Sequence, residues 1–221
     1  MVPNFFGADL AYTWPIYATG LIAYLIGSIP FGLILTRIAG LEDIRNIGSG
    51  NIGTTNVLRT GHKGLALTTL MLDVSKGVAA TLGAGIYGPD CAWIAGLFVV
   101  IGHMFPVWLK FQGGKGVATT IGVIFALSWT VGITVTTLWL VVVFLRRYSS
   151  LGAIIAIPSS PALLATLLAY QRSGDLPGWL PGEPLYVSLF GILAVLVLAR
   201  HHSNIQRLLN GTETRVFARR P

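Results

Sequence analysis

The feature that most constrains this chain is a series of long apolar segments with almost no charge. The first, residues 14–36, is charge-free and long enough to cross a bilayer as a helix, which takes about 20 residues at about 1.5 Å each. Only 10% of the 221 residues are charged, whereas ordinary soluble domains carry about 25%. So few charges cannot cover a soluble globule or keep a chain disordered. We therefore expect an all-α, polytopic membrane protein with a single domain over residues 1–221.

Six apolar segments are candidates for membrane spans: residues 14–36, 64–87, 91–109, 117–145, 151–170 and 185–199. Pro30 should kink the first segment near its end, and Pro158 and Pro161 should make the fifth irregular. No Lys or Arg precedes Arg37, so the basic start of a cleavable signal peptide is missing. We therefore expect the first helix to stay in the mature protein.

The fourth segment is ambiguous, because its 29 residues in one helix would run about 43 Å. If it forms two spans, making seven in all, 13 of the 15 Lys and Arg residues share one side of the membrane. Lys76 then lies within a span and Arg172 lies opposite, whereas one long span would move Arg146 and Arg147 across. The positive-inside bias therefore predicts seven transmembrane helices, with the N-terminus outside and the C-terminus cytoplasmic.

The formal net charge of +7 is typical of cytoplasmic loops at an anionic membrane surface, so no nucleic-acid partner is expected. Residues 200–221 form a basic cytoplasmic tail, and residues 1–13 an N-terminal extension. The single cysteine, Cys91, excludes an internal disulfide and a multi-cysteine metal site. Acids are few on the predicted inner face, so neither a metal nor a cofactor is expected.

Four polar segments fall on the predicted cytoplasmic face: residues 45–56, 113–116, 146–150 and 200–204. They combine glycines, cations and small hydroxyl or amide side chains. Glycines let backbone N–H groups turn toward an anion, and Lys or Arg supplies charge-assisted hydrogen bonds. These components together predict a phosphate or other oxyanion site.

Two glycine-rich motifs each have a less specific alternative. Residues 48–53 match the dinucleotide-binding pattern formally, but no buried strand precedes them, and the alternative is a membrane-surface turn. Residues 113–116 precede an apolar helix whose dipole favours an anion, although no Ser or Thr follows Lys115 as it would in a Walker A loop. The alternative there is an ordinary helix cap. The dense Ser, Thr and Asn residues beside Arg45 and Arg59 favour the anion site.

The titratable residues near the spans include few side chains that could act as a strong general base. Asp73 and Lys76 are three residues apart on one predicted helix and are interpreted as a neutralising structural pair. His201 can act as a base near neutral pH or donate to phosphate, whereas His103 and His202 are interpreted as interfacial histidines. Neither a Ser-His-Asp triad nor an acid pair for glycoside hydrolysis can be placed. The pattern therefore suits a substrate that is already activated and phosphorylated.

At these segments the sequence resembles the bacterial membrane-bound glycerol-3-phosphate acyltransferases that use acyl phosphate as donor. The resemblance runs from about residue 20 to residue 217. Its motifs, in chain order, are residues 27–32, 45–56, 72–77, 102–106, 113–119, 147–151 and 200–213. It implies seven spans in the bacterial inner membrane, with the active site on the cytoplasmic face.

The resemblance further implies acyl transfer from acyl phosphate to the 1-hydroxyl of sn-glycerol 3-phosphate, giving lysophosphatidic acid and phosphate, without a protein partner. The expected catalytic residues are Ser49, Arg59, Lys115, Ser150, His201 and Asn204. The expected substrate-binding residues are Arg45, Asn51, Gly53, Thr55, Asn56, Gly113, Gly114 and Gly116. Glu213 is expected to be structural.

An acyl phosphate has a good leaving group, so we expect direct attack by the glycerol hydroxyl, with its proton passing to the leaving phosphate or to His201. The acyl chain would enter laterally from the bilayer. Two alternatives remain open: an anion transporter of the inner membrane that uses the same cations, and a structural membrane scaffold. A transporter would place its site near the bilayer midplane, often within inverted repeats.

Overall fold

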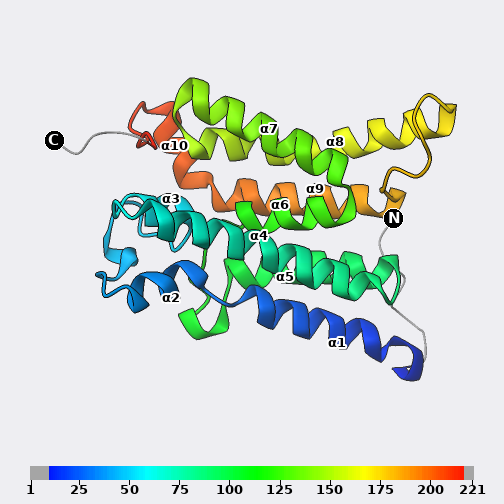
Figure 1. The fold of residues 1–221 in the computed structure, drawn as a ribbon, viewed down its shortest axis with the longest axis horizontal. Coiled ribbons are helices and arrows are strands. Elements are labelled where there is room, and N and C mark those ends of the chain that lie inside the picture. Colours follow the sequence, from blue (N-terminus) through cyan, green and yellow to red (C-terminus); the bar gives the residue numbers. More distant parts are fainter. Residues whose placement is uncertain (1–9, 217–221) are drawn as a thin grey trace.

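A computed structural model describes residues 10–216, and this part of the chain is helical throughout, without strands. The helices are, in chain order, α1 (Leu10–Gly27), α2 (Phe31–Ile38), η1 (Ile44–Asn46), α3 (Thr54–Leu58), α4 (Lys63–Gly85), α5 (Pro89–Met104), η2 (Val107–Leu109), α6 (Val117–Leu127), α7 (Trp129–Arg146), α8 (Ser149–Ser173), α9 (Pro184–Arg200) and α10 (His202–Leu209). The long helices lie roughly along one axis, with α3 and α10 at one end and the loop after α8 at the other (Figure 1).

Five segments of the described chain are long and apolar enough to cross a membrane: Thr13–Ile38, Lys63–Gly85, Pro89–Leu109, Trp129–Arg146 and Ser149–Ser173. A sixth results if α9 is taken with α10, which bends away from it by 59°. Helix α6 is apolar, but its 11 residues extend only about 16 Å, about half of the hydrocarbon core. The predicted membrane protein with helical spans is therefore confirmed, and the count of seven is not settled by helix length.

The ambiguous segment 117–145 is divided at Ser128. Figure 1 shows α6 running away from the end that carries α3 and α10, and α7 returning toward it. Gly132 of α7 packs against Phe125 of α6, where a Cβ atom would lie 2.7 Å from the Phe125 ring. The two helices thus form an antiparallel hairpin.

The prolines behave in two different ways. Pro30 separates α1 from α2, as predicted from the sequence. The predicted irregularity at Pro158 and Pro161 is wrong, because α8 continues through both. The Ser160 hydroxyl donates to the Ile157 carbonyl at 2.7 Å, which is the group that Pro161 leaves without its helical N–H partner.

Close helix packing at glycines holds the bundle together. A Cβ atom at Gly27 of α1 would lie 2.1 Å from the Val99 carbonyl oxygen of α5, and one at Gly122 of α6 would lie 2.2 Å from the Val74 carbonyl oxygen of α4. Small residues allow such backbone approach in membrane helix pairs. These contacts fix α4, α5 and α6, whose ends carry much of the site described next.

Candidate active site

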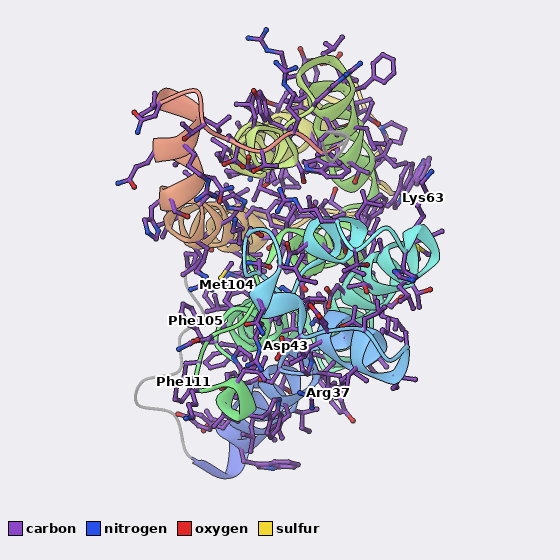
Figure 2. All side chains as sticks on the ribbon, turned by 90° about the vertical axis from the view of Figure 1, so that its left-hand side faces the viewer. Arg37, Asp43, Lys63, Met104, Phe105 and Phe111 are labelled. Carbon is purple, nitrogen blue, oxygen red and sulfur yellow. The ribbon has the colours of Figure 1, made fainter. Side chains whose placement is uncertain are left out.

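One cavity of about 500 Å³ opens at the end of the bundle near α3 and α10. Residues from all four predicted polar segments line this cavity. Figure 2 views the molecule from this end and shows Lys63, the first residue of α4, at one edge of the molecule. Its polar lining includes Gly48, Ser49, Asn51, Gly53, Thr54, Thr55, Asn56, Arg59, Lys115, Gly116, Ser149, Ser150, His201, Asn204, Arg207 and Glu213. The fold thus brings together residues as far apart in the chain as Gly48 and Val216.

The buried side chain of Asn56 organises the first polar segment. Its amide nitrogen donates to the Ile44 carbonyl at 2.7 Å, and its amide oxygen accepts from the Ser49 backbone N–H at 3.1 Å and from Arg59 Nη1 at 3.5 Å. Gly48 has a φ of +57°, and a Cβ there would lie 2.7 Å from the same oxygen. Asn56 therefore positions Ser49 and Arg59 on one side of the pocket.

The other expected substrate contacts in this segment divide between the pocket and its surroundings. Asn51 and Thr55 line the pocket, and Thr55 also shares a hydrogen bond of 3.2 Å with the Ser149 hydroxyl. Arg45 does not line it: its guanidinium pairs with Asp43 at 2.9 Å and lies exposed. The hydrogen bonds from Arg45 hold the pKa of Asp43 at about 2. The structure therefore keeps this ion pair outside the pocket.

The second polar segment is held against the end of α5. The backbone N–H of Gly113 donates to the Met104 carbonyl at 3.1 Å, and that of Gly114 donates to the His103 carbonyl at 3.0 Å. A Cβ at Gly113 would lie 2.2 Å from the His103 carbonyl oxygen. These two amides are committed within the protein and do not turn toward an anion, contrary to our expectation. Gly113 and Gly114 instead allow the loop to pack closely enough to place Lys115 in the pocket.

Arg200 holds the same loop from the opposite side. Its guanidinium donates to the Gly113 carbonyl at 3.0 Å and to the Gly114 carbonyl at 3.2 Å, and lies 5.2 Å from the centre of the Phe105 ring. No sequence pattern distinguished Arg200 from the other cations of the tail. Its position directly after the last apolar segment was the available signal.

A hydrogen-bond network joins Lys115 to the C-terminal segment. The Lys115 ammonium donates to the Asn204 amide oxygen, and the Asn204 amide nitrogen donates to Glu213 at 2.7 Å. Glu213 also accepts from the Ser150 hydroxyl at 2.7 Å and from Arg207 Nε at 2.8 Å. Burial opposes ionisation of Glu213, but these hydrogen bonds lower its pKa. Glu213 is therefore an ionised anchor for three groups, one from α8 and two from α10.

Burial lowers the pKa of Lys115 to about 8. Burial also lowers the pKa of Arg59, although a guanidinium remains charged at neutral pH. Among the described lining residues, Arg59, Lys115 and Arg207 thus place three cations beside Glu213. Half-buried cations in excess over acids can bind phosphate groups through charge-assisted hydrogen bonds.

His201 presents a neutral ring to the pocket. Its Nδ1 lies 2.7 Å from the Val197 carbonyl oxygen, which can only accept, so this nitrogen carries the hydrogen and Nε2 keeps its lone pair. Burial lowers the pKa of His201 to about 4. Nε2 can therefore accept a hydrogen bond from a substrate hydroxyl, but it is a weak base.

The predicted pair of Asp73 and Lys76 is present, with 2.7 Å between carboxylate and ammonium. Lys76 also donates to His103 Nδ1 at 2.8 Å and to the Ile29 carbonyl at 3.1 Å. Asp73 and His103 reach the wall of the pocket, and a Cβ at Gly114 would lie 2.0 Å from His103 Nε2. His103 is therefore a buried link between the ion pair and the Lys115 loop, which no local sequence pattern indicated.

The pocket continues from its polar end as an apolar arm between α4, α6 and α7. Helix α6 packs against both of the others. The residues that line this arm are Leu70, Met71, Val74, Val117, Ala118, Ile121, Phe125, Thr136, Trp139 and Ala153. Fold and site together define a class: an integral membrane protein with a cationic pocket at one end of its helices, joined to an apolar arm, which suits phosphorylated amphiphiles.

The comparisons with known proteins specify this class further. The family model "Glycerol-3-phosphate acyltransferase" matches residues 17–211, and the chain belongs to this family. A glycerol-3-phosphate acyltransferase of Rhodopseudomonas palustris (strain BisB5) is 51% identical over 203 residues, covering 91% of this chain and 96% of the relative. One of Brucella anthropi is 50% identical over 196 residues, covering 89% and 90%.

Solved structures agree with this assignment. The crystal structure of PlsY (YgiH), an integral membrane glycerol 3-phosphate acyltransferase, in its glycerol 3-phosphate form, is similar with a TM-score of 0.80 and 35% identity. Its lysophosphatidic acid form gives a TM-score of 0.79 and 34% identity. Each comparison covers 90% of this chain and 94% of the other.

Proposed function

We propose that this protein transfers an acyl group from acyl phosphate to the 1-hydroxyl of sn-glycerol 3-phosphate, giving lysophosphatidic acid and inorganic phosphate. The observation that carries the proposal is the continuity of one pocket, with Arg59, Lys115 and Arg207 at its polar end and an apolar arm leading from it. Both reactants bring a phosphate for the cations, and the donor also brings an acyl chain for the arm.

The reaction is direct attack of the glycerol oxygen on the acyl carbonyl carbon. The bond between that carbon and the phosphate oxygen breaks, and phosphate leaves. The proton of the hydroxyl passes to the leaving phosphate, with His201 Nε2 as the alternative acceptor. The low pKa of His201, about 4, favours the phosphate as the final acceptor.

Positioning and charge are the main contributions of the protein. Lys115 and Arg59 stabilise the negative charge that develops on the carbonyl and phosphate oxygens. Ser49 is held beside Arg59 through Asn56, and its hydroxyl donates a hydrogen bond to a phosphate oxygen of the substrate. Ser150 and Asn204 both donate hydrogen bonds to Glu213, and they thereby hold Lys115 and the C-terminal segment in fixed positions relative to each other. We assign Glu213 this structural role.

The enzyme acts in the inner membrane of a bacterium, with seven spans, the N-terminus outside and the pocket facing the cytoplasm. The hairpin of α6 and α7 supports this topology, because Lys115 before α6 and Ser149 after α7 line the same pocket. The short helix α6, none of whose residues is exposed, is then one of the seven spans. We propose that the enzyme needs no protein partner.

The test is an assay of the purified protein with palmitoyl phosphate and glycerol 3-phosphate. We expect phosphate release that requires both reactants, together with lysophosphatidic acid as product. An anion transporter, the alternative function, would release no phosphate but would carry labelled glycerol 3-phosphate into liposomes. Transport without acyl transfer would overturn the proposal.

A further inference from the structure

The apolar arm of the pocket has a defined far end, where two helix faces meet. On α6 the lining residues Val117, Ile121 and Phe125 are spaced four apart, so they form one stripe along the helix. Helix α6 ends at Leu127, before a further member of the stripe could follow. Phe125 is therefore the last α6 side chain along the arm.

The stripe on α7 runs toward the same point. Trp139 and Thr136 line the arm, and the next position on that face, four residues earlier, is Gly132. Gly132 is buried, and a Cβ there would lie 2.7 Å from Phe125 Cγ and 3.0 Å from Phe125 Cα. The absence of a side chain at Gly132 thus lets Phe125, which lines the arm, pack directly against α7.

We propose that Phe125, seated against Gly132, sets the length of acyl chain that this enzyme accommodates along the arm. Val117 and Phe125, the first and last lining residues of α6, are eight positions apart, which corresponds to about 12 Å along the axis of α6. An extended chain advances about 1.25 Å per carbon, so about ten carbons fit beside this stretch before the ring. Further carbons meet Phe125 and must leave the arm sideways. This inference rests on the proposed acyl transfer.

Two substitutions are expected to move selectivity in opposite directions. Phe125→Ala removes the ring and extends the arm. Each additional methylene of the donor that becomes buried there should raise kcat/KM roughly fourfold. Gly132→Ala should push the ring further into the arm and so lower kcat/KM for donors with longer acyl chains. Phe144→Ala is the matched control, because Phe144 lies on α7 but is 81% exposed and does not line the pocket.

The measurement is a competition between lauroyl and stearoyl phosphate in one tube, read as the ratio of the two lysophosphatidic acids. This ratio does not depend on how much of each variant is folded. We expect Phe125→Ala to raise the ratio of stearoyl to lauroyl product by about tenfold or more, corresponding to about two buried methylenes. Gly132→Ala should lower the ratio, and Phe144→Ala should leave it unchanged.

An unchanged ratio in an active Phe125→Ala variant overturns the inference while leaving acyl transfer intact. Absence of product from the unsubstituted enzyme would instead contradict the proposed function. If Phe125→Ala does not fold, Phe125→Leu replaces it, and the same shift is expected at smaller size. An unchanged ratio in that variant equally overturns the inference.

Discussion

Lys115 is partly buried and donates a hydrogen bond to Asn204. Among the described residues, it is the only lysine that lines the pocket. Replacing it with Ala removes a charge-assisted bond to substrate worth about 1.5–3 kcal/mol. We expect kcat/KM to fall roughly 10- to 100-fold in Lys115→Ala. Lys63→Ala, an exposed lysine at the start of α4, is the control. Near-normal turnover by the folded Lys115→Ala enzyme would refute this role.

The pKa of Lys115 also predicts a pH dependence. Burial lowers this pKa to about 8, so the free enzyme loses the ammonium proton, and with it the charge, as the pH rises through that value. We expect kcat/KM, which reports the free enzyme, to decline above pH 8 after subtraction of the enzyme-free hydrolysis. A guanidinium keeps its proton beyond about pH 12, so Lys115→Arg should lack this decline. The same decline in both enzymes would assign it to another group.

Gly114 tests the contact between the Lys115 loop and α5. A Cβ there would lie 2.0 Å from His103 Nε2, and Lys76 holds that ring from its other side. We expect Gly114→Ala to lower activity at least about tenfold by displacing Lys115, since small misplacements are costly in catalysis. Adding His103→Ala should cost less in Gly114→Ala than in the unsubstituted enzyme. Strictly additive losses of activity in this double-mutant cycle would show that the methyl group introduced by Gly114→Ala does not clash with the His103 ring.

Helix α4 illustrates at the scale of an element how a charged pair is tolerated inside a membrane bundle. Lys76→Met leaves the Asp73 carboxylate buried without its ammonium partner, which typically costs about 3–5 kcal/mol. We expect a clear loss of thermal stability in detergent. Asp73→Asn combined with Lys76→Met should be more stable than Lys76→Met alone. Ser75→Ala, an exposed site on the same helix, is the control, and equal stability of all variants would contradict the argument.

Helix boundaries show what local sequence rules capture at this scale. The break at Pro30 follows from proline chemistry, and the division of segment 117–145 follows from its length together with the charge bias. The regular course of α8 through Pro161 does not, because it depends on the Ser160 hydroxyl and on neighbouring helices. A rule that treats proline as a breaker omits those partners.

The topology of the whole molecule can be tested by labelling single cysteines in a Cys91→Ala background. We expect Asp175→Cys, in the loop after α8, to react with an impermeant maleimide in intact cells. Lys63→Cys should react only after permeabilisation. The seven-span topology places these sites on opposite sides of the membrane. Equal labelling of both in intact cells would be evidence against it.

The sequence by itself was enough to predict a helical membrane protein and the four polar segments that line the pocket. This was possible because hydropathy, charge bias and short motifs are local properties that a single chain displays directly. Arg45 was also expected at the site, but it pairs with Asp43 two residues away and lies outside the lining.

Only the tertiary structure decided how the segments cooperate. It committed the amides of Gly113 and Gly114 to α5, placed Arg200 on that loop, and made Glu213 the meeting point of Ser150 and Asn204. These contacts join residues far apart in the chain, so they depend on how helices pack at glycines and not on any local pattern. The reason is physical: hydropathy determines that a segment enters the membrane, whereas side-chain geometry across helices determines what it meets there.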